Sequence, residues 1–212
     1  MSSSCSHHCE SCTANCGSRK EKDFSVPLAQ KSHIKKVIGI VSGKGGVGKS
    51  MVSMALAVLM QRKGNQCGIL DGDITGPSIP KGFGLREKLV TQDGLMVPAK
   101  TKTGIDVVST NLILDEETAP VIWRGPMISG VVQQFWKDVL WENEDYLFID
   151  MPPGTGDVPL TVFQSLPVDG IVVVSSPQGL VGMVVQKAIS QYLILPFSAL
   201  GPIRSATHQR PD

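Results

Sequence analysis

The most constraining feature of this sequence is a glycine-rich loop, residues 43–50, that joins an apolar strand-like run to an apolar helix-like run. The loop reads Gly-Lys-Gly-Gly-Val-Gly-Lys-Ser. Val37–Val41 before it is rich in β-branched residues and predicts a buried strand, and Met51–Met60 after it predicts a largely buried helix. This arrangement matches the Walker A pattern, in which backbone N–H groups surround phosphates. A glycine-rich turn can mimic the loop by chance, but the flanking strand and helix favour a site for ATP with Mg²⁺, formed by Gly43, Lys44, Gly45, Gly46, Val47, Gly48, Lys49 and Ser50.

Further apolar runs of strand length predict the fold class. They are Cys67–Asp71, Ile105–Ser109, Tyr146–Asp150 and Gly170–Ser175, and a helix is predicted over Ile128–Val139. Apolar strands alternating with helices indicate an α/β fold, the three-layer P-loop NTPase kind, with a mainly parallel sheet covered on both faces. Ligands of such sheets lie beyond the carboxyl ends of the strands.

Three aspartates follow strands at that edge. Asp150 ends an apolar strand, as a Walker B aspartate does when it holds Mg²⁺; the alternative is a strand-end aspartate that caps the next turn. Asp71 and Asp73 stand on either side of Gly72. One of these two carboxylates can position the metal while the other orients or deprotonates the attacking water, and spacing leaves open which does which. The residues therefore predict that the Ser50 hydroxyl and Asp150 bind Mg²⁺, together with one of Asp71 and Asp73.

Two lysines belong to the loop. Lys49 neutralises phosphate charge in the Walker A pattern. Lys44 could be an ordinary solvated side chain, but at its position beside the first loop glycine it can reach phosphate oxygens of its own nucleotide or of a partner subunit's nucleotide. We therefore expect Lys44 and Lys49 to take part in catalysis, together with one of the two aspartates beside Gly72.

The cysteines are distributed unevenly along the chain. Cys5, Cys9, Cys12 and Cys16 lie in residues 1–33, a polar stretch that predicts a flexible cysteine-rich arm. Four thiolates at this spacing could bind a [4Fe-4S] cluster or Zn²⁺, or could remain free thiols. The fifth cysteine, Cys67, falls in a predicted buried strand and is expected to be a small core residue.

Composition narrows the choice of partners and of compartment. The 212-residue chain has a formal net charge of +1, with 20 basic and 19 acidic residues, which gives no reason to expect nucleic acid as a partner. No apolar run approaches the roughly 18 residues of a membrane span, and the first residues lack a secretion signal. We expect a cytoplasmic protein that binds no membrane.

Several longer motifs support a resemblance to a known family. The loop Lys44–Ser50 resembles the deviant Walker A loop of the MinD and ParA class. Four further segments resemble motifs of the Mrp-type iron–sulfur carrier ATPases: Asp71–Ser78, Trp123–Pro126, Asp150–Asp157 and Ser176–Gly179. The resemblance implies an ATPase that forms a homodimer, with Lys44 acting across it, and that carries a [4Fe-4S] cluster to apo iron–sulfur proteins. It also implies that Asp73 is the hydrolytic switch residue, which makes Lys44, Lys49 and Asp73 the expected catalytic residues. Asp150 is then the Walker B acid, and Asp71 joins Ser50 and Asp150 as the expected Mg²⁺ ligands.

The resemblance covers residues 34–189, which we expect to be the ATPase domain. Residues 190–212 differ from the family pattern and lack its Cys-x-x-Cys pair, so we expect a divergent or truncated tail. Two other functions fit parts of the pattern: a ParA- or MinD-like positioning ATPase, and an ATP-binding adaptor stabilised by Zn²⁺ on the cysteine arm.

Overall fold

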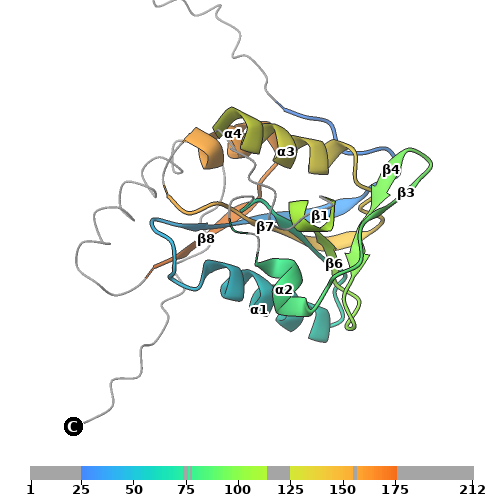
Figure 1. The fold of residues 1–212 in the computed structure, drawn as a ribbon, viewed down its shortest axis with the longest axis horizontal. Coiled ribbons are helices and arrows are strands. Elements are labelled where there is room, and N and C mark those ends of the chain that lie inside the picture. The colour runs from blue at the N-terminus through green and yellow to red at the C-terminus, as the bar shows by residue number, and fades with distance from the viewer. Residues whose placement is uncertain (1–24, 74–75, 77, 114–124, 155–156, 176–212) are drawn as a thin grey trace, which may run out of the picture.

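The computed structural model describes residues 25–73, 76, 78–113, 125–154 and 157–175. The predicted arm cysteines and the predicted tail lie outside these residues. The central sheet contains β1 (Ile34–Ser42), β2 (Cys67–Asp71), β5 (Ala99–Lys100), β6 (Asp106–Val108), β7 (Glu144–Asp150) and β8 (Gly170–Val174). Its strand order is β5-β6-β2-β7-β1-β8, and all neighbours are parallel except β5 and β6 (Figure 1).

Helices cover both faces of this sheet. On one face lie α1 (Lys49–Arg62) and α2 (Ile79–Phe83), and on the other lie α3 (Gly125–Lys137) and α4 (Asp157–Ser165) (Figure 1). Alternate residues of β1 supply the two cores: Val37 and Val41 belong to the core beneath α3 and α4, and Ile38 and Ile40 to the core beneath α1. The three-layer α/β fold with a mainly parallel sheet is confirmed.

The predicted strands are present, with small differences at their ends. β2 has the bounds expected, β1 and β7 begin earlier than their apolar runs, and α1 begins at Lys49. The parallel register places Asp71 of β2 opposite Asp150 of β7, and Asp150 opposite Ile40 of β1. The ends of three neighbouring strands therefore meet where the glycine-rich loop begins.

A hairpin that the sequence did not predict projects from the sheet. It consists of β3 (Val90–Gln92) and β4 (Leu95–Val97), joined by Asp93 and Gly94, whose φ angles of 51° and 80° suit a two-residue turn. Backbone hydrogen bonds in both directions between Met96 and the segment after α3 hold the hairpin to the body. Strands of three residues are too short to show a periodic pattern, which explains why sequence analysis left this region irregular.

Residues 25–33 pack against the body, although we expected folded structure to begin near the start of β1. In this N-terminal strap, the Val26 amide donates a hydrogen bond to the Ser165 carbonyl at 2.8 Å. The Trp136 indole donates to the Val26 carbonyl at 2.9 Å, and the Ala29 amide donates to the Trp136 carbonyl at 3.3 Å. The strap thus fastens the start of the folded region to α3 and α4.

Buried ionisable groups lie at the opposite edge of the sheet, where the strands begin. Glu144 is buried, and burial followed by its interaction with Asp106 raises its pKa to about 8. Asp106 forms an ion pair with Lys100 at 2.6 Å. Cys67 is 1% exposed, and burial raises the pKa of its thiol to about 12, with the charge of Glu144 adding to the effect. Cys67 is therefore a protonated core residue, as its sequence context predicted.

None of the helices in the described part of the chain has the length and apolar character needed to cross a membrane.

The packing around Gly68 in β2 predicts a large effect of a single methyl group. A Cβ at Gly68 would lie 2.9 Å from Leu147 Cδ1 and 2.9 Å from Trp141 Cζ3, and both of those side chains are fully buried. We expect Gly68→Ala to lower the free energy of unfolding by about 1–3 kcal/mol, measured by urea denaturation, because the core must be displaced.

Gly130→Ala on α3 is the matched control, because a Cβ there would meet no atom within 4 Å. We expect this variant to be unchanged or more stable by up to about 1 kcal/mol. Equal destabilisation of the two variants would contradict the packing argument.

Candidate functional site

The loop between β1 and α1 leaves the start of the helix open to an anion. Gly46 and Gly48 have φ angles of 75° and 87°, a region that favours glycine. Gly48 is the N-cap of α1, no side chain caps the helix there, and its first turn holds no acidic residue. The first backbone N–H groups and the positive end of the helix dipole therefore remain available, which is the arrangement that binds phosphate.

Asp150 at the end of β7 is the centre of the charged groups. It is fully buried, and its Oδ2 atom lies 2.8 Å from Lys49 Nζ. The Ser50 hydroxyl donates to Oδ2 at 2.6 Å, and the Ser53 hydroxyl donates to Oδ1 at 2.7 Å. These three partners on the first turns of α1 neutralise and solvate the carboxylate in place of water.

The Lys49 ammonium group is only partly satisfied by these neighbours. It is 6% exposed, and Asp73 Oδ2 lies 3.7 Å away on its other side. Although Asp150 is close, no described residue accepts a hydrogen bond of good geometry from Lys49 Nζ. A buried cation with unused donors, beside an uncapped helix start, fits a phosphate group.

Asp71 lies deeper than Asp73 in the same site. It is fully buried and accepts hydrogen bonds from the Ser109 hydroxyl at 3.1 Å and from the Asp73 backbone amide at 3.2 Å. Burial, followed by the charge of Asp150 on the adjacent strand, raises the pKa of Asp71 to about 8, although Ser109 and Lys49 oppose the shift. In the absence of a bound cation, Asp71 holds a proton at neutral pH.

The segment after β7 lies against the glycine-rich loop. The Met151 amide donates to the Ile40 carbonyl at 3.0 Å, and the Gly154 amide donates to the Ser42 carbonyl at 2.8 Å. Pro153 faces Gly45, whose Cβ would lie 3.9 Å from the proline ring. Residues 151–154 therefore link Asp150 directly to the backbone that enters the loop.

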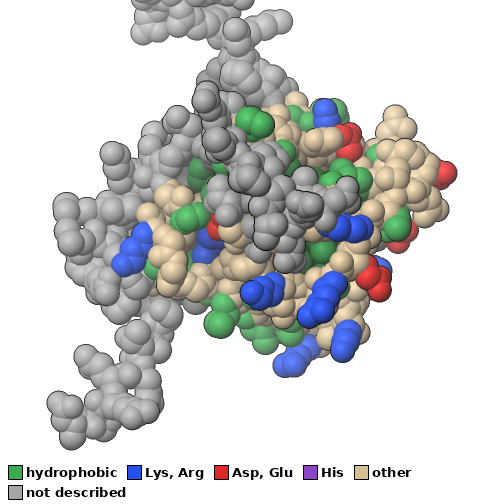
Figure 2. Space-filling model, in the orientation of Figure 1, with side chains coloured by type: hydrophobic (Ala, Val, Ile, Leu, Met, Phe, Trp, Pro, Cys, Tyr) green, Lys and Arg blue, Asp and Glu red, His purple; other side chains and the backbone are tan. Residues whose placement is uncertain are grey.

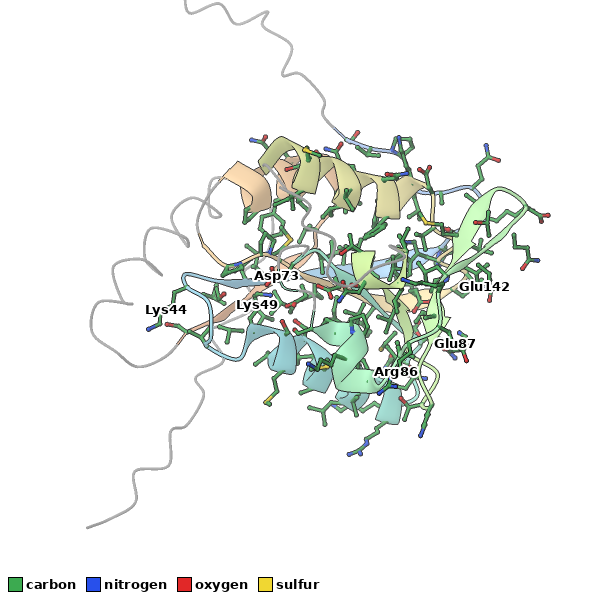
Figure 3. All side chains as sticks on the ribbon, in the orientation of Figure 1. Lys44, Lys49, Asp73, Arg86, Glu87 and Glu142 are labelled. Atoms are coloured by element: carbon green, nitrogen blue, oxygen red, sulfur yellow. The ribbon has the colours of Figure 1, made fainter. Side chains whose placement is uncertain are left out.

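The structure brings together Lys49, Ser50, Asp71, Asp73 and Asp150, all of which were predicted site residues. Lys44 is exposed at the outer tip of the loop, away from Lys49 and Asp73 (Figure 3).

Sequence analysis missed Ser53 and Ser109. Ser53 could have been found, because it lies four residues after Lys49 and so on the same face of the helix. Ser109 follows β6, and only the strand order shows that it adjoins Asp71.

The oxygen ligands present fit magnesium. Within the described ranges, no three His, Cys, Asp or Glu side chains form a closed metal cage. Mg²⁺ does not need one, since proteins usually hold it through one or two carboxylates together with substrate phosphates and water. Ser50 and Asp150, already in contact, are ligands of that kind.

Comparison with known proteins identifies the family. A family model described as ParA, NUBPL iron-transfer P-loop NTPase, matches residues 33–205. The chain belongs to this family. The predicted resemblance to the iron–sulfur carrier ATPases of the MinD and ParA class is thereby confirmed.

Curated relatives of this P-loop NTPase carry the name iron-sulfur cluster carrier protein. The Clostridium perfringens relative is 52% identical over 166 residues, which are 74% of this chain and 58% of that protein. The Methanococcus maripaludis relative is 37% identical over 213 residues, which are 97% of this chain and 73% of that protein. This chain therefore spans little more than half the length of the first of these relatives.

Solved structures agree with the fold. A nucleotide-binding protein from Archaeoglobus fulgidus, in complex with ADP, superposes with a TM-score of 0.70 at 43% identity, covering 80% of this chain and 65% of that one. The cell division ATPase MinD of Pyrococcus furiosus has a TM-score of 0.58 at 20% identity, covering 79% and 70% respectively. The second likeness shows the P-loop NTPase fold alone.

The raised pKa of Asp71 predicts a pH-dependent stability. Between about pH 4 and pH 8 the folded protein keeps a proton on Asp71 that the unfolded chain has lost, so rising pH favours unfolding across this window. Asp71→Asn carries no such proton. We compare the free energies of unfolding of the wild type and of Asp71→Asn in EDTA and without nucleotide. From pH 5 to pH 8 the wild-type value should fall by a few kcal/mol relative to that of the variant, because one pKa unit corresponds to about 1.4 kcal/mol.

The measurement is urea denaturation of both proteins at several pH values. Parallel stability curves for the two proteins would show that Asp71 is ionised in the folded state.

Proposed function

We propose that this protein is an ATP-hydrolysing carrier that holds a [4Fe-4S] cluster and passes it to apo iron–sulfur proteins. The nucleotide half of the proposal rests on one observation, the buried and incompletely satisfied Lys49 ammonium beside the uncapped start of α1. The carrier half is supported by the family and by the names of its relatives. Membership of a nucleotide-hydrolysing family supports the ATPase reaction.

In this proposal the loop residues Gly43–Ser50 bind the ATP phosphates through their backbone amides, and Lys49 donates to the phosphate oxygens. Ser50, Asp150 and Asp71 hold Mg²⁺, which neutralises phosphate charge. Asp73, on the open side of Lys49, orients the attacking water and accepts its proton as the bond to the γ-phosphate forms and the β–γ bridge breaks.

ATP binding would rearrange contacts that the structure shows. Lys49 and Ser50 both contact Asp150 here, and phosphate and Mg²⁺ compete for these two groups. Residues 151–154 follow Asp150 and are bonded to the entry of the loop. A change at Asp150 would therefore reach the backbone at the entry of the loop, and hydrolysis would reverse it.

The remaining parts of the proposal concern the cargo and the assembly. Cys5, Cys9, Cys12 and Cys16 hold the cluster, with Zn²⁺ as the alternative. Two copies form a cytoplasmic homodimer in which Lys44 contacts the partner's nucleotide, and the exposure of Lys44 at the loop tip favours such a contact.

Substitution of the two loop lysines should change different properties, ATP binding for Lys49 and turnover for Lys44. Lys49→Gln removes the buried cation and should abolish ATP binding measured by calorimetry. Lys44→Gln should leave binding within a few-fold of the wild type and lower kcat by about 100-fold or more, because it acts on charge that develops in the transition state.

Lys63→Gln, at the far end of α1, is the control and should hydrolyse ATP normally. A Lys44→Gln protein with normal turnover would assign Lys44 to the solvated surface.

Anaerobic reconstitution with iron and sulfide tests the carrier function. We expect a [4Fe-4S] absorption spectrum and about four irons per chain. A variant with Ser at all four arm cysteines should lack the cluster and still bind ATP. Transfer is measured as the activity regained by an apo [4Fe-4S] enzyme.

Zinc retained on purification, with no cluster formed after its removal, would favour the adaptor function instead. An ATP-binding protein that takes up neither metal would end the carrier proposal.

A further inference from the structure

A cavity of about 380 Å³ lies beside the β3–β4 hairpin. One wall is residues 84–90, between α2 and β3, and the other is residues 97–100, from the end of β4 through β5. Figure 3 places Arg86 and Glu87 at the opposite end of the molecule from Lys44. The volume suits a bound ligand, and the nucleotide mechanism uses no part of this hairpin cavity.

Both walls of the hairpin cavity are fixed by the fold. The Leu85 amide donates to the Pro80 carbonyl at 2.8 Å, and the Leu89 amide donates to the Leu112 carbonyl at 2.8 Å. On the other side, Ala99 pairs with Val107 in the main sheet. A ligand would therefore meet a preformed site, which lowers the entropic cost of binding.

The surroundings of the cavity are basic although the whole chain is almost neutral. The charged side chains in its lining are Arg86, Glu87, Lys88 and Lys100, three basic and one acidic. Lys100 is paired with Asp106 at 2.6 Å, so Arg86 and Lys88 carry the remaining positive charge, beside Glu87. Lys and Arg side chains gather over α2 and the loop after it (Figure 2). Lys88 Nζ donates to the Asn111 carbonyl at 3.3 Å. Within the described ranges, neither Lys88 nor the exposed Arg86 guanidinium forms an ion pair. Among the described residues, no carboxylate is paired with Arg86 or Lys88, so these two cations suit an acidic ligand.

The cavity also offers apolar surface and an open strand edge. Leu85, Leu89, Val97 and Pro98 line it, and Val90 is 64% exposed at its rim. Among the described strands, β3 pairs with β4 alone, and Val90 at the start of β3 lines the cavity. Extended peptides bind such edges through their backbone and place alternate side chains in adjoining pockets.

We propose that the hairpin cavity and the outer edge of β3 bind an extended acidic peptide segment of a partner protein. Apolar side chains of the segment enter the cavity, and its carboxylates lie beside Arg86 and Lys88. The proposal does not depend on cluster carriage, so its failure would leave the proposed function standing.

The test uses the full chain and a fluorescein-labelled peptide of sequence Glu-Asp-Leu-Glu-Val-Asp-Leu-Glu, with binding followed by fluorescence anisotropy. We expect Arg86→Glu combined with Lys88→Glu to weaken binding about tenfold, because two favourable charge contacts become repulsive. Val90→Ser should weaken binding without changing charge. Lys137→Glu, an exposed residue on α3, is the matched control and should bind like the wild type.

Two altered peptides separate the contributions of charge and apolar contact. Replacing Glu and Asp by Gln and Asn, or Leu and Val by Ser, should each reduce binding. The proposal would be overturned if the double variant bound the peptide with unchanged affinity, or if Lys137→Glu weakened binding as much as the double variant does. Full binding of the Ser-substituted peptide would also overturn it. Tighter binding of single-stranded DNA with the same dependence on Arg86 and Lys88 would also overturn it in favour of a nucleic-acid surface. ATP hydrolysis and thermal unfolding confirm that each variant is folded.

Discussion

The buried contact between Lys49 and Asp150 is the interaction on which the rest of the structure depends. Both charges have left water, and such a pair is tolerated only when further hydrogen bonds satisfy it, as Ser50 and Ser53 do for the carboxylate. The contact forms because β7 lies next to β1 and because the loop of residues 43–48 places the start of α1 beside the end of β7. The contact that prepares the site for phosphate therefore depends on both the strand order and the loop between β1 and α1.

Much of the fold and of the site could be predicted from the sequence because the signals there are local. The apolar run in β2 gave its bounds correctly, and the glycine-rich loop located Lys49 and Ser50. The placement of Asp150 at a strand end was predicted from the apolar residues that precede it. The proximity of Asp150 to Asp71 could be predicted because the carboxyl ends of neighbouring parallel strands meet at one edge of the sheet.

Other features depend on contacts between distant segments, which local patterns do not encode. Ser109 acts on Asp71 because β6 lies beside β2, and the strap at residues 25–33 is held by Trp136, about 110 positions away along the chain. The strap packs Val26 and Leu28 against the core and buries Ala29, but so short an apolar run has no periodic pattern. Its hydrogen bonds to α3 and α4 could be recognised only once the helices were placed.

The buried thiol of Cys67 has a practical consequence for studying the cysteine arm. Thiol reagents attack the thiolate, and a group with a pKa of about 12 that is 1% exposed presents almost none at neutral pH. Alkylation of the native protein therefore does not count Cys67, so any thiols that react there belong to Cys5, Cys9, Cys12 or Cys16. Cys67 becomes reactive when the sheet opens. Counting reactive thiols before and after denaturation thus distinguishes protection by a bound metal from protection by the fold.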